Sequence, residues 1–151
     1  MPEIHIKRFH VENDAIDVHQ HVNNQEYLRW MQEIAIEHST AQGWPMARYL
    51  ECGSSWYVKS HFIDYLRPAL LGDEIIIATW VSGMFERNSP RHTLFLRASD
   101  RQVLVRAETQ WIFVNLRTGR PIAIPAELRS DFDIVETESE AFVRLETALE
   151  R

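Results

Sequence analysis

Residues 23–41 of this 151-residue chain, NNQEYLRWMQEIAIEHSTA, determine the fold class. Asn23 is a favourable N-cap residue, and Glu26 has the spacing of a capping box. Apolar residues at spacings of three and four form one face of a helix, and they are Tyr27, Leu28, Met31, Ile34 and Ala35. Gly43 ends the pattern. We therefore predict a helix over about residues 24–41, roughly 27 Å long and central to the domain.

Around this helix, alternating apolar and polar residues predict strands. We expect five strands, over residues 3–11, 55–65, 74–81, 91–98 and 102–115. One strand, a long helix and four antiparallel strands that can wrap the helix make an α+β arrangement. The domain is expected to cover residues 1–131, and residues 132–151 form an acidic C-terminal extension that is weakly helical in pattern.

Two of the expected strands have a notable apolar alternation. In the first strand, Ile4 and Ile6 fall on one face, whereas Phe9 and Val11 fall on the other. A single buried face would require a bulge or a strand end between the two pairs, near Lys7. In the second strand, Trp56, Val58 and Phe62 are expected to share one face.

Composition excludes several functional classes. A formal net charge of −6 does not fit general nucleic-acid binding, which requires a basic surface. The longest apolar run, residues 75–81, is far shorter than the roughly 20 residues that a membrane-spanning helix needs. The N-terminus lacks the apolar segment of a signal peptide, and the single cysteine, Cys52, cannot form an internal disulfide. We expect a cytoplasmic protein with no membrane span.

The segment before the helix contains the candidate catalytic residue. Asp17 lies in a predicted loop just ahead of the helix N-terminus. The first turn of a helix has backbone N–H groups without internal acceptors and a partial positive charge, so it can polarise a carbonyl oxygen. A nearby carboxylate can attack that carbonyl or activate water for the attack. Thioesters suit this small set of groups because they are electrophilic and release a good thiolate leaving group.

The run DVHQHVNNQEYLRWMQE, residues 17–33, resembles the signature of 4-hydroxybenzoyl-CoA thioesterase-like hotdog proteins, and within them the bacterial type III long-chain acyl-CoA thioesterases. The segments IDYLRPALLGDEIIIAT (63–79) and ETQWIFVNLRTGRPIAIP (108–125) resemble later parts of the same family in the same order. The resemblance covers roughly residues 4–131. It implies a hotdog fold, in which a long helix is wrapped by an antiparallel sheet, and a homodimer or homotetramer.

The resemblance also implies the site. Asp17 would be the nucleophile or general base, and the backbone N–H of Asn24 would polarise the carbonyl group. Asn23 is expected to cap the helix beside the substrate, and Asn24 could instead use its side chain. Tyr27, ten residues after Asp17, is either a substrate-binding residue or part of the core. His21 would orient Asp17 within the loop.

The substrate implied is a small-molecule acyl-CoA, and no cofactor is expected, since coenzyme A enters as part of the substrate. The candidates to bind its phosphates are Arg67, Arg87 and Arg91. His19 and His21 form an H-x-H pair, but no further ligands complete a zinc site, so no metal is predicted.

Three alternatives share the fold. A hotdog hydratase would need a histidine at another spacing and a proline in the loop, and this sequence has neither. An acyl-carrier-protein thioesterase would use the same Asp17, although the negative net charge disfavours an acidic carrier. A non-catalytic acyl-CoA-binding protein would not depend on that carboxylate.

Overall fold

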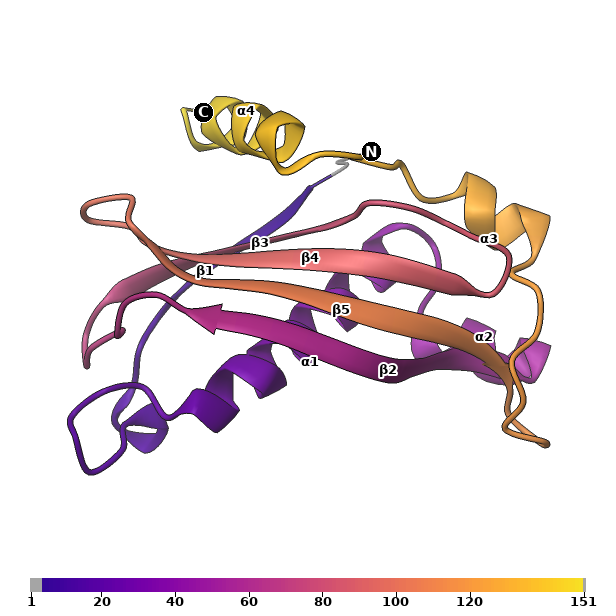
Figure 1. Cartoon of the computed structure of the whole chain (residues 1–151), viewed down its shortest axis with the longest axis horizontal. Helices are drawn as coiled ribbons and strands as arrows, with labels where there is room; N and C mark the ends of the chain where they lie inside the picture. The colour runs from indigo at the N-terminus through magenta and orange to yellow at the C-terminus, as the bar shows by residue number, and fades with distance from the viewer. Residues whose placement is uncertain (1–3, 151) are drawn as a thin grey trace.

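The computed structural model describes residues 4–150, which form a five-stranded antiparallel sheet around one long helix (Figure 1). The elements are β1 (His5–His10), a 3-10 turn (Asn13–Ala15), α1 (Asn24–Ala41), α2 (Met46–Cys52), β2 (Ser54–Tyr65), β3 (Glu74–Val81), β4 (Asn88–Arg97), β5 (Val103–Asn115), α3 (Ala126–Ser130) and α4 (Glu138–Leu149). The predicted α+β hotdog fold and the helix over 24–41 are confirmed.

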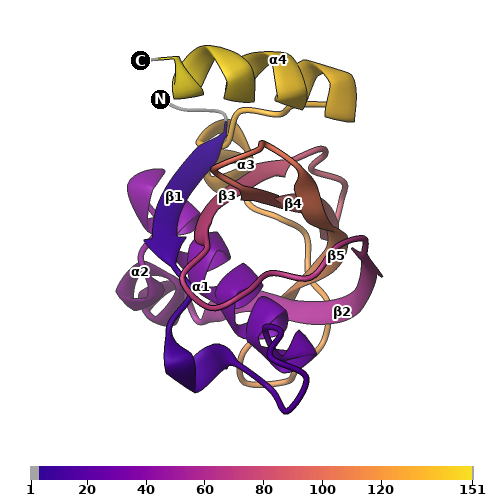
Figure 2. The ribbon, with the colours of Figure 1, turned by 90° about the vertical axis from the view of Figure 1, so that its left-hand side faces the viewer.

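The sheet has the strand order β1-β3-β4-β5-β2 and curves around α1 (Figure 2). The apolar stripe of α1 packs against the concave face of the sheet, where Ile34 contacts a cluster that includes Ile77 and Phe95. These side chains are almost fully buried. Burial of this stripe stabilises a helix that would be only marginally stable in isolation.

The outer face of the sheet is also covered, by α4 (Figures 1 and 2). Ile76, Trp80, Leu94, Ala141 and Leu145 form a buried cluster there. The described part of the predicted acidic extension is therefore helical over Glu138–Leu149 and shares a hydrophobic cluster with the sheet.

The bulge predicted near Lys7 is wrong. β1 pairs with β3 in one continuous register from His5 to His10. Ile4 and Ile6 pack into the outer cluster beneath α4, whereas Phe9 and Val11 pack into the cluster around α1. Both faces of the strand are buried, so the change of face in the apolar pattern needs no irregularity.

The shared face predicted for Trp56, Val58 and Phe62 is also wrong. The pairing of β2 with β5 shifts by one residue between Val58 and Ser60, which is a β-bulge at Lys59. A bulge reverses the alternation of side chains along the strand. Phe62 is consequently 66% exposed, and Ile63 packs against the core.

No helix among residues 4–150 is long and apolar enough to cross a membrane. The two edge strands of the sheet differ in length. β1 has 6 residues, whereas β2 has 12 and pairs with β5 on one side only.

Candidate functional site

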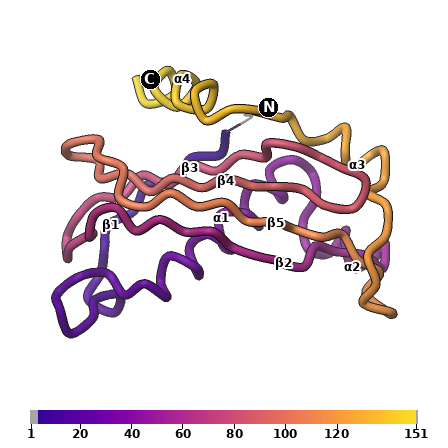
Figure 3. The backbone as a smooth tube through the Cα atoms, in the orientation of Figure 1, coloured from indigo at the N-terminus to yellow at the C-terminus, as the bar shows by residue number. Residues whose placement is uncertain are grey.

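Asp17 lies in a tight hairpin that leads directly into α1, at the end of the molecule where the indigo trace loops out (Figure 3). Ile16 pairs with Val22, and the Asp17 N–H donates to the His21 carbonyl oxygen over 2.8 Å. Gln20 adopts φ +65, the left-handed conformation that closes the turn. The Asn23 N–H donates to the Ala15 carbonyl over 2.8 Å, so the hairpin is anchored where the helix begins.

The Asp17 carboxylate is held by backbone N–H groups of its own turn. Its Oδ1 atom accepts hydrogen bonds from the N–H groups of His19, over 2.9 Å, and His21, over 3.2 Å. The side chain is partly exposed, as an attacking group requires. His21 was predicted to orient Asp17. The contact is made by the backbone N–H of His21, whereas the His21 side chain is exposed.

The N-terminus of α1 is capped by Asn23, whose Oδ1 accepts from the Gln25 N–H over 3.0 Å. The predicted capping box is wrong, because the Glu26 carboxylate bonds Arg29 at 2.7 Å and the Asn23 N–H is taken by Ala15. Within residues 4–150, no acceptor contacts the N–H of Asn24. A solvent-facing N–H at the positive end of a helix can therefore donate to a substrate oxygen.

The turn that holds Asp17 and the start of α1 are held together at one end of the molecule, because Ile16 pairs with Val22 and the Asn23 N–H donates to the Ala15 carbonyl oxygen.

Tyr27 lies in the core, where it has 3% exposure and packs against Trp30 and Phe95. Burial is the largest influence on its hydroxyl group and raises its pKa to about 12, while a hydrogen bond to the backbone of Ala69 opposes this shift. Of the two roles considered for Tyr27, the structure favours core packing.

The three arginines that were predicted to bind phosphate do not lie at one common site. Arg67 is exposed and lines a shallow depression together with Arg101, between the β2–β3 and β4–β5 connections. Arg87 is exposed in the connection before β4. Arg91 is 7% exposed and points inward beneath α1, so it does not offer a surface contact to a phosphate. Sequence inspection missed Arg101.

A cavity of about 470 Å³ opens beside the C-terminal half of α1, between α1, α2, β2 and β5. This volume lies within the range of small-molecule sites. Its walls are mostly apolar and include Ile36, Trp56, Val58 and Trp111. Arg91 lines the same cavity. The cavity was not predicted, because its walls come from segments far apart in the sequence.

A short chain of hydroxyl groups closes one side of the cavity. Ser39 Oγ donates to the carbonyl oxygen of Trp44 over 2.8 Å. Its oxygen is also 2.7 Å from the Tyr49 hydroxyl, which therefore donates to Ser39. The Tyr49 hydroxyl accepts in turn from the Trp56 indole N–H over 3.1 Å. Burial raises the pKa of Tyr49, so the hydroxyl stays protonated at neutral pH.

Among residues 4–150, no group of three histidine, cysteine, aspartate or glutamate side chains is arranged to hold a metal ion. His19 and His21 are both exposed on the Asp17 hairpin.

This fold defines a class of protein. The chain belongs to the thioesterase-like superfamily, whose family model matches residues 11–132, and it is a thioester hydrolase. Among individual relatives, it is 25% identical to the long-chain acyl-CoA thioesterase FadM of Escherichia coli, over 87% of this chain and 95% of the relative.

Solved structures agree on the fold. A 1,4-dihydroxy-2-naphthoyl-CoA thioesterase from Synechocystis superposes with a TM-score of 0.77 at 16% identity, over 85% of this chain and 94% of the other. An acyl-ACP thioesterase from Bacteroides thetaiotaomicron gives a TM-score of 0.81 at 18% identity, over 89% of this chain and 55% of the other.

Proposed function

We propose that this protein is an acyl-CoA thioesterase that hydrolyses an acyl thioester to the free acid and coenzyme A. The observation that carries the proposal is the Asp17 hairpin, which holds a partly exposed carboxylate next to the open N-terminus of α1. Asp17 serves as nucleophile or general base, and the Asn24 N–H donates to the carbonyl oxygen as it becomes negative.

Both forms of the reaction balance. As a general base, Asp17 takes a proton from water as the water oxygen bonds to the carbonyl carbon, the C–S bond breaks and the thiolate then takes up a proton. As a nucleophile, the carboxylate bonds to the carbonyl carbon and expels the thiolate, which takes up a proton. Water then hydrolyses the resulting mixed anhydride, which releases the free acid and restores the Asp17 carboxylate. One oxyanion donor contributes about 10²–10³ in rate, and general base catalysis contributes about 10²–10⁴. A carboxylate and a helix N-terminus are therefore sufficient equipment for a reactive thioester.

Coenzyme A is favoured as the thiol carrier by the similarity to FadM, a long-chain acyl-CoA thioesterase, and by the local charge. The exposed Arg67 and Arg101 line one depression on the surface and supply two cations for phosphate groups. The segment that carries Arg67 also contacts the Asp17 hairpin, because His21 forms a β-bridge with Leu70, three residues after Arg67. The net charge of −6 disfavours an acidic carrier protein.

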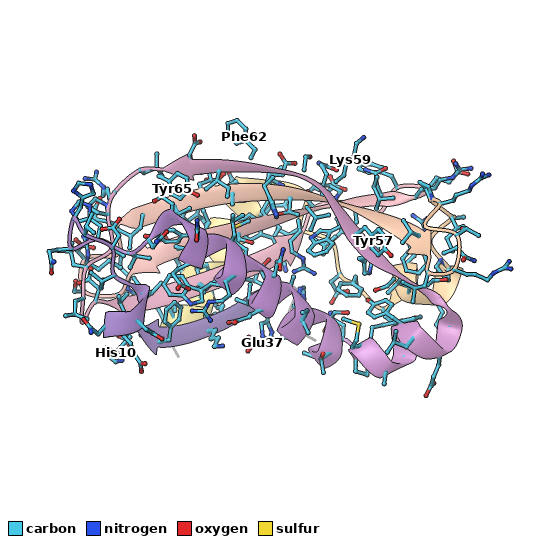
Figure 4. The ribbon with its side chains drawn as sticks, turned by 90° about the horizontal axis from the view of Figure 1, so that it is seen from below. His10, Glu37, Tyr57, Lys59, Phe62 and Tyr65 are labelled. Atoms are coloured by element: carbon cyan, nitrogen blue, oxygen red, sulfur yellow. The ribbon has the colours of Figure 1, made fainter. Side chains whose placement is uncertain are left out.

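A homodimer through β2 belongs to this proposal. Figure 4 shows Tyr57, Lys59, Phe62 and Tyr65 along this edge strand, with Phe62 pointing away from the protein. Tyr57 and Tyr65 are 49% and 44% exposed. A long edge strand with apolar side chains is a template for strand pairing. Antiparallel pairing of two β2 strands would continue the sheet through both protomers and bury these side chains, with the active site near the interface.

The test is a panel of acyl thioesters, from acetyl to palmitoyl and including benzoyl, each presented on coenzyme A and on acyl carrier protein. Free-thiol release gives kcat/KM for each substrate. The proposal expects turnover on coenzyme A that peaks in one class of acyl group and exceeds turnover on the carrier protein. Preference for the carrier protein would replace the proposed substrate, and no turnover on either would leave a binding role. Fractionation would test the predicted cytoplasmic location.

A further inference from the structure

The cavity beside α1 contains a buried cation without a buried anion. Arg91 is the one charged side chain among the described residues that line the cavity. Its Nη1 atom donates to Thr79 Oγ1 over 3.1 Å and lies 2.9 Å from His38 Nδ1. An arginine can only donate, so His38 Nδ1 accepts and the imidazole is neutral. Both partners of Arg91 are therefore uncharged.

The burial of this guanidinium group has an electrostatic cost. Burial lowers its pKa to about 10, and Tyr49 is the group that opposes the shift. The guanidinium remains charged at neutral pH, because this pKa still lies well above 7. Within residues 4–150, no carboxylate forms an ion pair with it. A buried charge without a counter-ion is unusual, since desolvation is costly unless the charge is paired.

The geometry of the guanidinium leaves one side open. Thr79 and His38 occupy Nη1, whereas no acceptor among the described residues contacts Nε or Nη2. These two N–H groups form the fork that binds a carboxylate through two parallel hydrogen bonds. The cavity therefore offers donors and lacks a matching anion.

We propose that this cavity binds an acyl group that carries a carboxylate at the end remote from the thioester, with Arg91 as the residue that selects it. The substrates would be thioesters of dicarboxylic acids. The inference rests on the proposed thioesterase function for its biological meaning, but binding of the carboxylate can be measured without hydrolysis.

The position of the cavity suits a long acyl chain. It is lined by α1 residues from Gln32 to Ser39. Along a helix axis these residues lie about 12 to 22 Å from Asn24, where the thioester carbonyl is expected. The apolar walls would contact the methylene groups between the two ends of the substrate, and the guanidinium would pair with the distal carboxylate.

The binding experiment compares two matched amides by isothermal titration calorimetry: dodecanamide, whose chain ends in a methyl group, and the monoamide of dodecanedioic acid, whose chain ends in a carboxylate. The wild type is compared with Arg91→Met, which keeps an unbranched apolar stem without the charge, and with Arg91→Lys, which keeps the charge without the fork. We expect the wild type to bind the monoamide of dodecanedioic acid about ten- to a hundred-fold more tightly than dodecanamide. Arg91→Met should reverse this preference, and Arg91→Lys should keep part of it. Thermal unfolding of each variant verifies that it is folded.

Hydrolysis of dodecanoyl-CoA and dodecanedioyl-CoA separates this inference from the proposed function. A preference for the diacid thioester in kcat/KM that Arg91→Met reverses supports both. Turnover that favours the methyl-terminated thioester, together with equal binding of the two amides, overturns the inference and leaves the thioesterase intact. Failure to hydrolyse either thioester, with binding of the carboxylate-terminated amide that depends on Arg91, overturns the proposed function and supports the assignment of the cavity.

Discussion

Replacement of Leu145 with alanine tests whether α4 is part of the folded domain. Leu145 is 2% exposed and packs on the outer face of the sheet in the cluster that contains Trp80 and Leu94. Buried Leu→Ala changes cost about 2–5 kcal/mol, and the cost increases by about 24 cal/mol per Å³ of cavity that remains. Because α4 is the last helix and can move towards the gap, we expect about 2–4 kcal/mol.

The assay is urea unfolding followed by circular dichroism, with Val143→Ala as the matched control. Val143 lies on the same helix but is 65% exposed, so its substitution should change the free energy of unfolding by less than about 0.5 kcal/mol. For a domain of this size, the Leu145→Ala change corresponds to a fall in Tm of about 4–16 °C. Thioesterase turnover of the folded variant should be unaffected, because the Asp17 hairpin packs on the opposite side of the sheet. Equal stability of the two variants would refute this account of α4.

Three further predictions concern the exposed edge strand β2, the N-cap of α1 and the dependence of stability on pH. Phe62→Asp should shift the protein from dimer to monomer in analytical ultracentrifugation, because a charge replaces a 66% exposed apolar side chain on β2; an unchanged sedimentation coefficient would exclude this edge. Asn23→Ala removes the hydrogen bond to the Gln25 N–H and should cost about 1 kcal/mol in denaturant unfolding, whereas no loss would mean the cap is not formed. Burial is the main cause that lowers the pKa of His92, so its protonation favours the unfolded chain. The stability from neutral His92 should therefore be present above about pH 6.5 and decline as pH falls below it, and His92→Gln should flatten that decline.

Local signals were sufficient for the central helix. Asn23 accepts the predicted hydrogen bond at the start of α1, and Gly43 adopts φ +95 just beyond its end. These features depend on neighbouring residues alone, so sequence inspection can find them. The loop that holds Asp17 was also predicted, but its hairpin pairing of Ile16 with Val22 was not.

Features that depend on contacts between segments far apart in the sequence could not be predicted from local sequence patterns. The bulge at Lys59 has no glycine or proline to mark it, and it reversed the face assigned to Phe62. The change of face in the apolar pattern of β1 depends on α4, which covers the outer face of the sheet and so buries one of the two apolar pairs.

Arg91 was chosen as a candidate site residue from the sequence, but its buried position was not predicted. It lies two residues before Thr93 and four before Phe95, so strand alternation places it on the inward face. Its charge suggested a surface position instead. Alternation was the stronger signal, because the packing of a strand fixes side-chain direction more firmly than residue type does.

The central claim is that the Asp17 carboxylate performs the hydrolysis beside the N-terminus of α1. The most direct test is kcat for Asp17→Asn on the best acyl-CoA of the panel, compared with Asp14→Asn, an exposed carboxylate in the same loop. We predict a fall of about 10²–10⁴-fold for Asp17→Asn with binding of the acyl-CoA retained, and little change for Asp14→Asn. Wild-type turnover in Asp17→Asn, or an equal loss in both variants, would contradict the assignment.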